Sequence, residues 1–532
     1  MRQLPAAVGF SVAALLVLTP VTTLGAGVDR QQSNDIARIS LRTADVDSLD
    51  PAIAYAVASW HLLDTTCALL ASYTGPRSSL VPEVARSAPR ITHGGKRYTF
   101  TLRKGFRFSD GAPVRADAFA RAIDRTLARG VESPWAAYTG DIMGASAVLA
   151  GRATHASGVV ARGTTLVINL VRPIPDFLVR TTFLCAVPPS LPSDREGVSV
   201  FPAAGPYYIA DHRPAESVTI RRNPHYGGTR PQRVEGFDVD LRASSQEEIV
   251  TRVERGTADW GWALANVYLD PGRRLAAKYG INRSQFFVMP GTEYRGYVLN
   301  TSRPLFRDNE SLRRAVNFAI DRSAFHRIAG GPAASTLTDQ YLPPLMPGFK
   351  DARIYPLTGP DLPRARELAR DNLRGGKAIL HTVASPLQLA LAQSVKRDLA
   401  KIGLTVEVKG IPLPAYFGRG GARGDYDIGF MPWIPDFEDP FAVLNVLFDG
   451  RFIGATNWAR FNSPKYNRLL REAARLRGAA RYRVYGKLDV RLARDAAPAI
   501  PVALMNDATL VSKRVGCVRH RVGFDLSAIC LR

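Results

Sequence analysis

The sequence is poor in the residue patterns that build catalytic or metal centres. It holds only four cysteines in 532 residues and no C-x-x-C pair, so neither a zinc ribbon nor a thioredoxin-type redox site is indicated. Its eight histidines are scattered, without H-x-x-x-H or H-E-x-x-H spacing. A G-x-S-x-G nucleophile motif and a P-loop are also missing. These absences argue against an enzyme and a protein-built metal site, and no cofactor is expected.

Long apolar runs are equally scarce. The one run of note, residues 6–18, is short for a membrane span, follows the positive charge of Arg2 and precedes Pro20. Residues 1–26 are therefore predicted to be a signal peptide that ends on the small residue Ala26. A retained membrane anchor is the alternative, whereas a lipid anchor is not supported because no cysteine lies near the cleavage point. We expect the mature chain to be exported.

Acidic residues are outnumbered, since 70 Lys and Arg stand against 47 Asp and Glu, which gives a net charge of +23. The excess is spread along the chain and forms no block like a nucleic-acid-binding arm. We therefore expect a solvated basic surface and no nucleic-acid binding. A more specific interpretation of the positive charge is that it attracts an anionic ligand or an anionic cell envelope. A basic polyanion-binding protein is the functional alternative of a different class.

The four cysteines suit an oxidising compartment, in which they allow three pairings. Cys517 and Cys530 flank a short loop, and we favour a bridge between them, which leaves Cys67 with Cys185. Closing the shorter loop would stabilise the fold by about 3 kcal/mol on chain-entropy grounds. Buried free thiols are the alternative.

What the sequence does contain is enough for several hydrophobic cores. A length of 532 residues, 46% of them hydrophobic, predicts two or three lobes. In residues 98–127, alternation over 98–103 predicts a half-buried strand, and Asp110-Gly111 predicts a turn. Apolar residues at helical spacing then predict a helix over 116–127. A further helix is predicted over 463–477, with Ser463 as its N-cap and Pro464 at its first position. Strand and helix patterns alternate along the chain, which indicates an α/β protein.

The stretch that begins at Tyr98 also resembles a known family. Its pattern YTF-x-LR-x-G-x-x-FSDG-x-P, at 98–113, is similar to a segment of the extracytoplasmic solute-binding proteins of the peptide/nickel class, family 5, which serve ABC importers. Other segments that resemble this family are GPYY at 205–208, RNP-x-Y at 222–226, RRAVNFAIDR at 313–322 and W-x-x-D-x-x-D-P at 433–440. The segment 313–322 is expected to form a helix. The resemblance covers nearly all of the mature chain.

The resemblance implies an α/β, periplasmic-binding-protein-like fold with two hinged lobes and an inserted extra domain. The first lobe would comprise residues 29–60, 201–285 and the return segment 496–532. The inserted domain would comprise residues 61–200, and the other lobe residues 286–495.

The resemblance also implies where a ligand binds. In peptide-binding members, a carboxylate at the position of Asp436 receives the ligand's α-ammonium group, because a buried carboxylate needs a cation that also donates hydrogen bonds. Trp433 would give a flat wall or a cation–π face, and Tyr55, expected on a helix, would line the cleft. For Tyr55, packing in a helical core is the alternative. Asp439 is a further candidate. For both acids, the alternative is a capped turn.

A glycine-rich basic loop, GRGGARG at 418–424, precedes this segment, and its spacing departs from G-x-G-x-x-G. Arg419 and Arg423 are candidates for contacting a ligand carboxylate. A surface loop without a ligand role is the alternative.

Together these patterns predict an exported receptor that captures a small ligand between two lobes and delivers it to the permease of an ABC importer. A peptide is the first choice of ligand, and a metal chelate, an opine or an oligosaccharide is the alternative. We expect a monomer that acts in the periplasm or on the exterior of the cell envelope.

Overall fold

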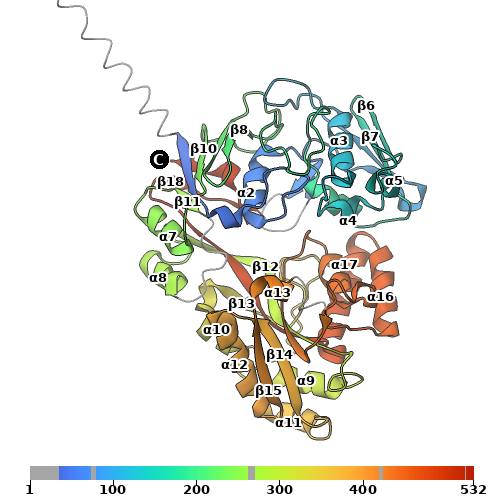
Figure 1. Ribbon diagram of the computed structural model, residues 1–532, viewed down its shortest axis with the longest axis vertical. Coiled ribbons are helices and arrows are strands. Elements are labelled where there is room, and N and C mark those ends of the chain that lie inside the picture. Colours follow the sequence, from blue (N-terminus) through green and yellow to red (C-terminus); the bar gives the residue numbers. More distant parts are fainter. Residues whose placement is uncertain (1–34, 74–79, 262–269, 418–422, 522) are drawn as a thin grey trace, which may run out of the picture.

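The computed structural model describes residues 35–73, 80–261, 270–417, 423–521 and 523–532. The predicted signal peptide lies outside these residues. Figure 1 shows two lobes, one above the other, with the long strands β12 and β17 where they meet. The upper part combines the first lobe with an extra domain, and the lower part is the second lobe. The expected arrangement of two α/β lobes with an additional domain is confirmed.

The first lobe is built on a five-stranded sheet in the order β11-β1-β10-β9-β8. β1 is parallel to both of its neighbours, and the other pairs are antiparallel. Apolar side chains that alternate along these strands form the core of the lobe, as a period of two requires. Its elements are β1 (Ile36–Ser40), α2 (Val57–Thr66), β8 (Tyr207–Arg213), β9 (Ser217–Arg222), β10 (Gly236–Asp240), α7 (Gln246–Glu254), β11 (Trp260–Gly261) and α8 (Asp270–Tyr279).

The extra domain has a four-stranded antiparallel sheet in the order β4-β5-β7-β6. The helix predicted for residues 116–127 is confirmed as α3, whose apolar face packs on this sheet. The predicted strand begins one residue earlier, as β5. The elements of this part are β2 (Ala71–Tyr73), β3 (Leu80–Pro82), β4 (Arg90–Thr92), β5 (Arg97–Thr101), α3 (Ala116–Leu127), α4 (Ala136–Thr139), α5 (Ala145–Leu149), β6 (Val159–Arg162), β7 (Thr165–Asn169) and α6 (Phe177–Arg180).

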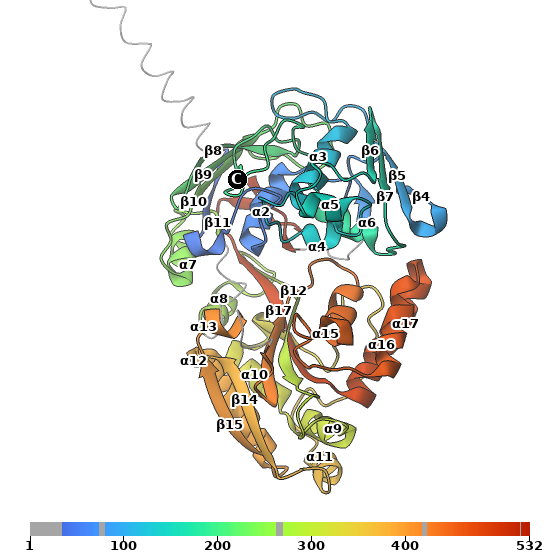
Figure 2. The same ribbon diagram turned by 45° about the vertical axis from the view of Figure 1, so that its right-hand side comes forward.

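The second lobe is a six-stranded mixed sheet, β13-β17-β12-β16-β14-β15, with a hydrophobic core on each face. One face carries α9 to α12, and the other carries α15 to α17 (Figures 1 and 2). Its elements are β12 (Phe286–Leu299), α9 (Glu310–Ala319), α10 (Arg322–Ala329), β13 (Ser335–Leu337), α11 (Leu362–Ala369), β14 (Lys377–Val383), α12 (Pro386–Ala400), β15 (Thr405–Ile411), α13 (Leu413–Ala415), β16 (Ile428–Trp433), α15 (Val446–Phe448), α16 (Pro464–Arg475), α17 (Gly478–Arg491) and β17 (Ala499–Leu510).

The C-terminal segment returns to the first lobe after β17. Val511 forms a bridge to Trp260 of β11, and Phe524 stacks on the same indole with ring centroids 5.2 Å apart. Cys517 and Cys530 form a disulfide that closes this segment. Its strands are β18 (Val515–Cys517), β19 (His520–Arg521), β20 (Gly523–Phe524) and β21 (Cys530–Leu531).

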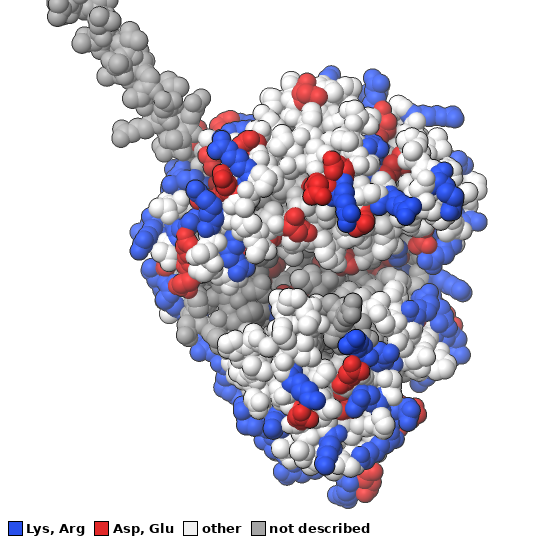
Figure 3. Space-filling model, viewed as in Figure 1, with Lys and Arg blue, Asp and Glu red and all other residues white. Residues whose placement is uncertain are grey.

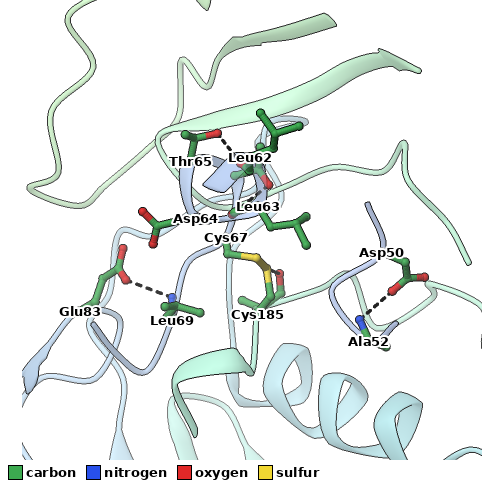
Figure 4. The surroundings of a disulfide bond; sticks show 12 residues. Asp50, Ala52, Leu62, Leu63, Asp64, Thr65, Cys67, Leu69, Glu83 and Cys185 are labelled. Carbon is green, nitrogen blue, oxygen red and sulfur yellow. Dashed lines mark hydrogen bonds between the residues drawn. A yellow bond between two sulfur atoms is a disulfide. The ribbon is translucent and has the colours of Figure 1, made fainter. Parts of the chain in front are cut away.

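A second disulfide joins Cys67, at the end of α2, to Cys185 (Figure 4). The residue at position 205 must be small because the chain passes this point closely. A Cβ at Gly205 would lie 2.4 Å from the carbonyl oxygen of Thr66, to which the Gly205 amide donates a hydrogen bond. The glycine of the GPYY segment is therefore required by packing at the junction of the first lobe and the extra domain.

Three local predictions were wrong. The segment 313–322 is not one helix, because α9 ends at Ala319 and α10 begins at Arg322. Tyr55, expected on a helix, lies two residues before α2 in extended chain, where Asp47 binds its backbone amide. The Ser463 side chain makes no cap hydrogen bond at α16, although Pro464 does begin that helix.

Many arginines point inward and so do not contribute to the basic surface. Arg313 donates to the carbonyl oxygens of Phe306 and Ala496, and Arg322 donates to that of Pro501. Arginine suits these sites because its rigid fork of five donors satisfies several carbonyl groups at once. Over the face shown in Figure 3, the remaining basic side chains are interspersed with acidic ones.

The first lobe and the extra domain are held together by a buried ion pair. Asp50 binds both terminal nitrogens of Arg125 in α3, at 2.9 and 2.5 Å, and both side chains are about 1% exposed. Asp50 also accepts hydrogen bonds from the amides of Ala52 and Val198. The carboxylate is thus fully satisfied by groups from three separate segments.

Replacing Asp50 by Asn should destabilise the protein, because the amide leaves the guanidinium of Arg125 buried without a counter-charge. Removing one partner of a buried pair costs about 3 kcal/mol. We expect a lower urea midpoint by circular dichroism. The control is Asp351→Asn, which removes an exposed pair with Arg353 and should change the midpoint little. Equal midpoints for the two variants would contradict the role given to Asp50.

Candidate functional site

The candidate site is the segment 433–440, which leaves the second lobe at the end of β16 and faces the upper part of the molecule. Trp433 is the last residue of β16 and pairs with Tyr294 of β12. Pro435 and Pro440 lack amide donors and so cannot continue the ladder. The segment then enters a π-helical turn at Phe441–Asn445, a rare form that often occurs at functional sites. A loop is therefore anchored at both ends by regular structure.

Two interactions hold this loop in shape. The indole of Trp433 donates to the carbonyl oxygen of Ala442 at 2.7 Å, which ties the start of the loop to the turn that follows it. Asp439 forms a two-point ion pair with Arg481 of α17, at 2.6 and 3.0 Å, and both side chains are about 2% exposed. Asp439 also accepts from the amide of Phe441. The loop is thus rigid on either side of Asp436.

Asp436 lies where the second lobe meets the other two parts of the molecule. The hydroxyl of Tyr55, from the first lobe, donates to one carboxylate oxygen at 2.7 Å. The hydroxyl of Tyr138, from α4 of the extra domain, donates to the other oxygen. One carboxylate therefore joins three parts of the chain that are far apart in sequence.

An aromatic cluster positions the two tyrosines. The ring of Trp135 lies 5.4 Å from that of Tyr55 and 6.3 Å from that of Tyr138. The indoles of Trp60 and Trp135 both donate to the carbonyl oxygen of Ala54, next to Tyr55. Because a single acceptor orients both indoles, the chain around Tyr55 is held in place although this side chain is half-exposed.

The extra domain makes a second contact with the candidate site through Arg180 of α6. Its guanidinium carbon lies 5.3 to 5.8 Å from the ring centroids of Tyr138, Phe437 and Phe441, within cation–π range. Tyr138 also packs edge-on against Phe437, at 5.3 Å. Rings from both sides of the boundary thus share one cation.

The electrostatics of Asp436 differ from those of its neighbours. In the described part of the chain, no Lys, Arg or His forms an ion pair with Asp436, whereas Asp439 has Arg481. Burial and the charge of Asp436 both raise the pKa of the hydroxyls of Tyr55 and Tyr138 well above the usual range. Both hydroxyls therefore stay protonated and act as donors at physiological pH. Each carboxylate oxygen keeps a lone pair that a further donor could use.

The structure places the predicted site residues in different surroundings. Asp436 and Tyr55 are brought together, and Trp433 lies beside them with its indole engaged within its own loop. The contacts of Asp439 are those of a structural ion pair. Arg423 is exposed, and its carbonyl oxygen accepts from Arg460. Arg419 lies outside the described residues. Ligand roles for these residues stay predictions.

Sequence reasoning missed three contributors, namely Tyr138, Arg180 and Arg481. The only signal for Tyr138 is its spacing of three residues from Trp135 in the stretch SPWAAYTG, which places both aromatic side chains near one another on a short helical turn. Nothing in the sequence links either residue to position 436, because that contact depends on how the lobes meet.

Two other kinds of feature are not found in the described part of the chain. Among the described residues, no group of three or more His, Cys, Asp or Glu side chains is arranged to hold a metal ion. Within the same residues, no helix combines the length and the apolar character needed to cross a membrane.

Comparisons with known proteins agree with this architecture. Residues 79–454 match the model of the bacterial extracellular solute-binding proteins, family 5 Middle. The chain is 25% identical over 401 residues to the oligopeptide-binding protein OppA of Bacillus subtilis, covering 71% of each chain. It is 26% identical over 463 residues to a probable deoxycholate-binding periplasmic protein of Escherichia coli, covering 80% of each. The solved structure of the clavulanic acid biosynthesis oligopeptide binding protein 2 superposes with a TM-score of 0.82 at 24% identity, over 93% of this chain and 95% of that one.

Removing both tyrosine hydroxyls should weaken the contact between the lobes. In the double variant Tyr55→Phe/Tyr138→Phe, the rings still pack, but Asp436 loses both donors. We expect the radius of gyration measured by small-angle X-ray scattering to increase, because the equilibrium moves toward separated lobes. The control is Tyr355→Phe, whose hydroxyl donates to Ala493 within the second lobe. An unchanged radius for the double variant would refute this account of the contact.

Proposed function

Because the chain belongs to the bacterial extracellular solute-binding proteins of family 5, we propose that it captures a peptide between its lobes and delivers it to an ABC importer. The observation that carries the choice of ligand is the carboxylate of Asp436, which faces the opposite lobe. It accepts from two hydroxyl groups and has no cation partner in the described part of the chain. The α-ammonium group of a peptide supplies both charge and donors to such a carboxylate.

Relatives support the peptide assignment without deciding it. One relative is named an oligopeptide-binding protein and another a probable deoxycholate-binding protein, so the family scaffold carries more than one kind of ligand. Deoxycholate is an anion without an amino group, and it would offer Asp436 a like charge. The site therefore favours a ligand with a free amine over an anionic one.

The proposed mechanism is capture by closure. A ligand shifts the protein toward the closed form only by the free energy of contacts that it makes when both lobes meet. Micromolar binding corresponds to about −8 kcal/mol, which is enough to bias a hinge. The closed receptor, exported through its signal peptide and acting as a monomer outside the cytoplasm, would then dock on the permease, and the partner ATPase would supply the energy.

Asp436→Asn should weaken the binding of peptides that have a free N-terminus. Loss of a charge-assisted interaction costs about 2 kcal/mol, roughly a thirtyfold rise in Kd. Isothermal titration calorimetry with trialanine and with N-acetyl-trialanine measures this effect. Wild type should prefer the free peptide, and the variant should bind both peptides alike.

The acetylated peptide separates ligand recognition from lobe contact. Asn at position 436 also alters the bonds to Tyr55 and Tyr138, but that change affects both peptides equally and cancels in their ratio. Asp425→Asn, on the exposed surface of the same lobe, controls for the loss of one negative charge. A variant at position 436 that kept the preference of wild type for the free amine would remove Asp436 from the binding site.

A further inference from the structure

A second feature of the boundary between the lobes is a cavity of about 30 Å³ beside the strands that join them. The second lobe and the C-terminal segment of the first lobe both contribute walls, so the cavity is complete only when the lobes meet. It borders the candidate site, because Glu438 lies two residues beyond Asp436. Its lining includes Gly291, Thr292, Glu438, Asp507, His520 and Arg521.

A bulge in β12 forms one wall. Met289 pairs with Asp507 and Glu293 pairs with Met505, so residues 290–292 of β12 lie opposite Asn506 alone in β17. A Cβ at Gly291 would lie 2.1 Å from the carbonyl oxygen of Met505, so only glycine permits this close approach. Bulges of this kind redirect side chains near functional sites. The bulge therefore forms the wall of the cavity next to the β17 residue Asp507, which pairs with Met289.

Within the described residues, the carboxylate of Asp507 has no partner. Its oxygens accept no hydrogen bond and form no ion pair there, and its side chain is partly buried in the wall of the cavity. Several buried acids in this chain are paired with arginine, as Asp50 is with Arg125 and Asp439 is with Arg481. The buried Asp489 has no arginine but accepts hydrogen bonds from Gln340 and from the amide of Tyr341. Among the described residues, Asp507 has neither kind of partner, although the protein has a net charge of +23. A ligand that supplies a cation would remove the cost of burying it.

His520 adds a second group without a partner. Its Nε2 atom is buried and makes no hydrogen bond among the described residues, and Phe524 packs edge-on against the ring at 5.7 Å. Burial lowers the pKa of His520, so the imidazole is neutral at physiological pH and can offer Nε2 as an acceptor. The cavity therefore combines a carboxylate with a neutral acceptor.

The one cation in the lining is already neutralised. The guanidinium of Arg521 binds the carboxylate of Asp64 and lies 3.0 Å from that of Asp525. Because two carboxylates outside the cavity bind Arg521, the charge of this guanidinium does not offset that of Asp507. Burial and the nearby charge of Glu293 raise the pKa of Asp507 to about 6, so it is ionised at neutral pH. The arrangement favours a cation over a neutral or anionic group.

We propose that this cavity is a subsite for a primary ammonium group on the ligand, such as the end of a lysine-type side chain, held by Asp507 and His520. This inference rests on the proposed peptide-binding function and adds a ligand class to it. The size of the cavity selects the group, because about 30 Å³ accommodates a head the size of a water molecule. An ammonium group has that size, whereas a planar guanidinium is larger.

The test is calorimetry with a set of tripeptides in which one alanine of trialanine is replaced, at each position in turn, by lysine, by norleucine or by arginine. Norleucine keeps the apolar stem of lysine and lacks the charge. At one position, we expect lysine to bind at least tenfold more tightly than norleucine, and arginine to gain less. In Asp507→Asn, the lysine preference should fall below threefold, while trialanine binds as it does to wild type.

The outcomes are distinct. Asp507→Asn keeps the shape of the side chain and removes a buried charge, so folding is not threatened, and Asp425→Asn again controls for net charge. Tripeptides that bind without any lysine preference, or a preference that survives in Asp507→Asn, would overturn this inference and leave the peptide function standing. Failure of every tripeptide to bind wild type would overturn both.

Discussion

The pairing of β12 with β17 is the constraint on which the rest of the molecule depends. These two long antiparallel strands lie at the centre of the second lobe's sheet, and β17 leads directly into the segment that completes the first lobe. β16 pairs with β12 and delivers the loop that carries Asp436. The bulge at residues 290–292 arises within the same pairing. The loop that carries Asp436 and the bulge at residues 290–292 are thus both positioned by the backbone hydrogen bonds of this one sheet.

Charge is distributed according to a simple rule. Arginines that are buried, such as Arg125 and Arg481, neutralise buried acids, and others satisfy carbonyl groups that would otherwise be left without donors. Buried acids without an arginine, such as Asp489, accept hydrogen bonds from amide groups instead. Asp436 and Asp507, for which the described residues supply no cation, both lie at the boundary between the lobes. Their negative charge is the basis for proposing a ligand that carries a positive charge.

Periodicity and family motifs predicted much of the fold and part of the candidate site. The helix at 116–127 was predicted to the residue, because its apolar spacing is regular and its core lies directly beneath it. The break at Ile320 was missed, because Arg322 must reach the carbonyl oxygen of Pro501, a contact far away in sequence. Position 436 was proposed as a ligand residue from its motif, whereas the contact of Tyr138 with Asp436 was not predicted. That contact depends on how separate lobes meet, and no local pattern encodes that.

The hydrogen bonds from Tyr55 and Tyr138 to Asp436 have a consequence for how a transporter would recognise the receptor. These bonds join the lobes through protein atoms alone. The closed conformation therefore does not by itself indicate that a ligand is bound. A membrane partner that recognised only the shape of the closed receptor would also bind the ligand-free protein, and such binding would be unproductive. The two forms must therefore differ in the lifetime of the closed conformation. The ligand-bound receptor stays closed for longer, because the ligand adds contacts that two phenol hydroxyls cannot provide.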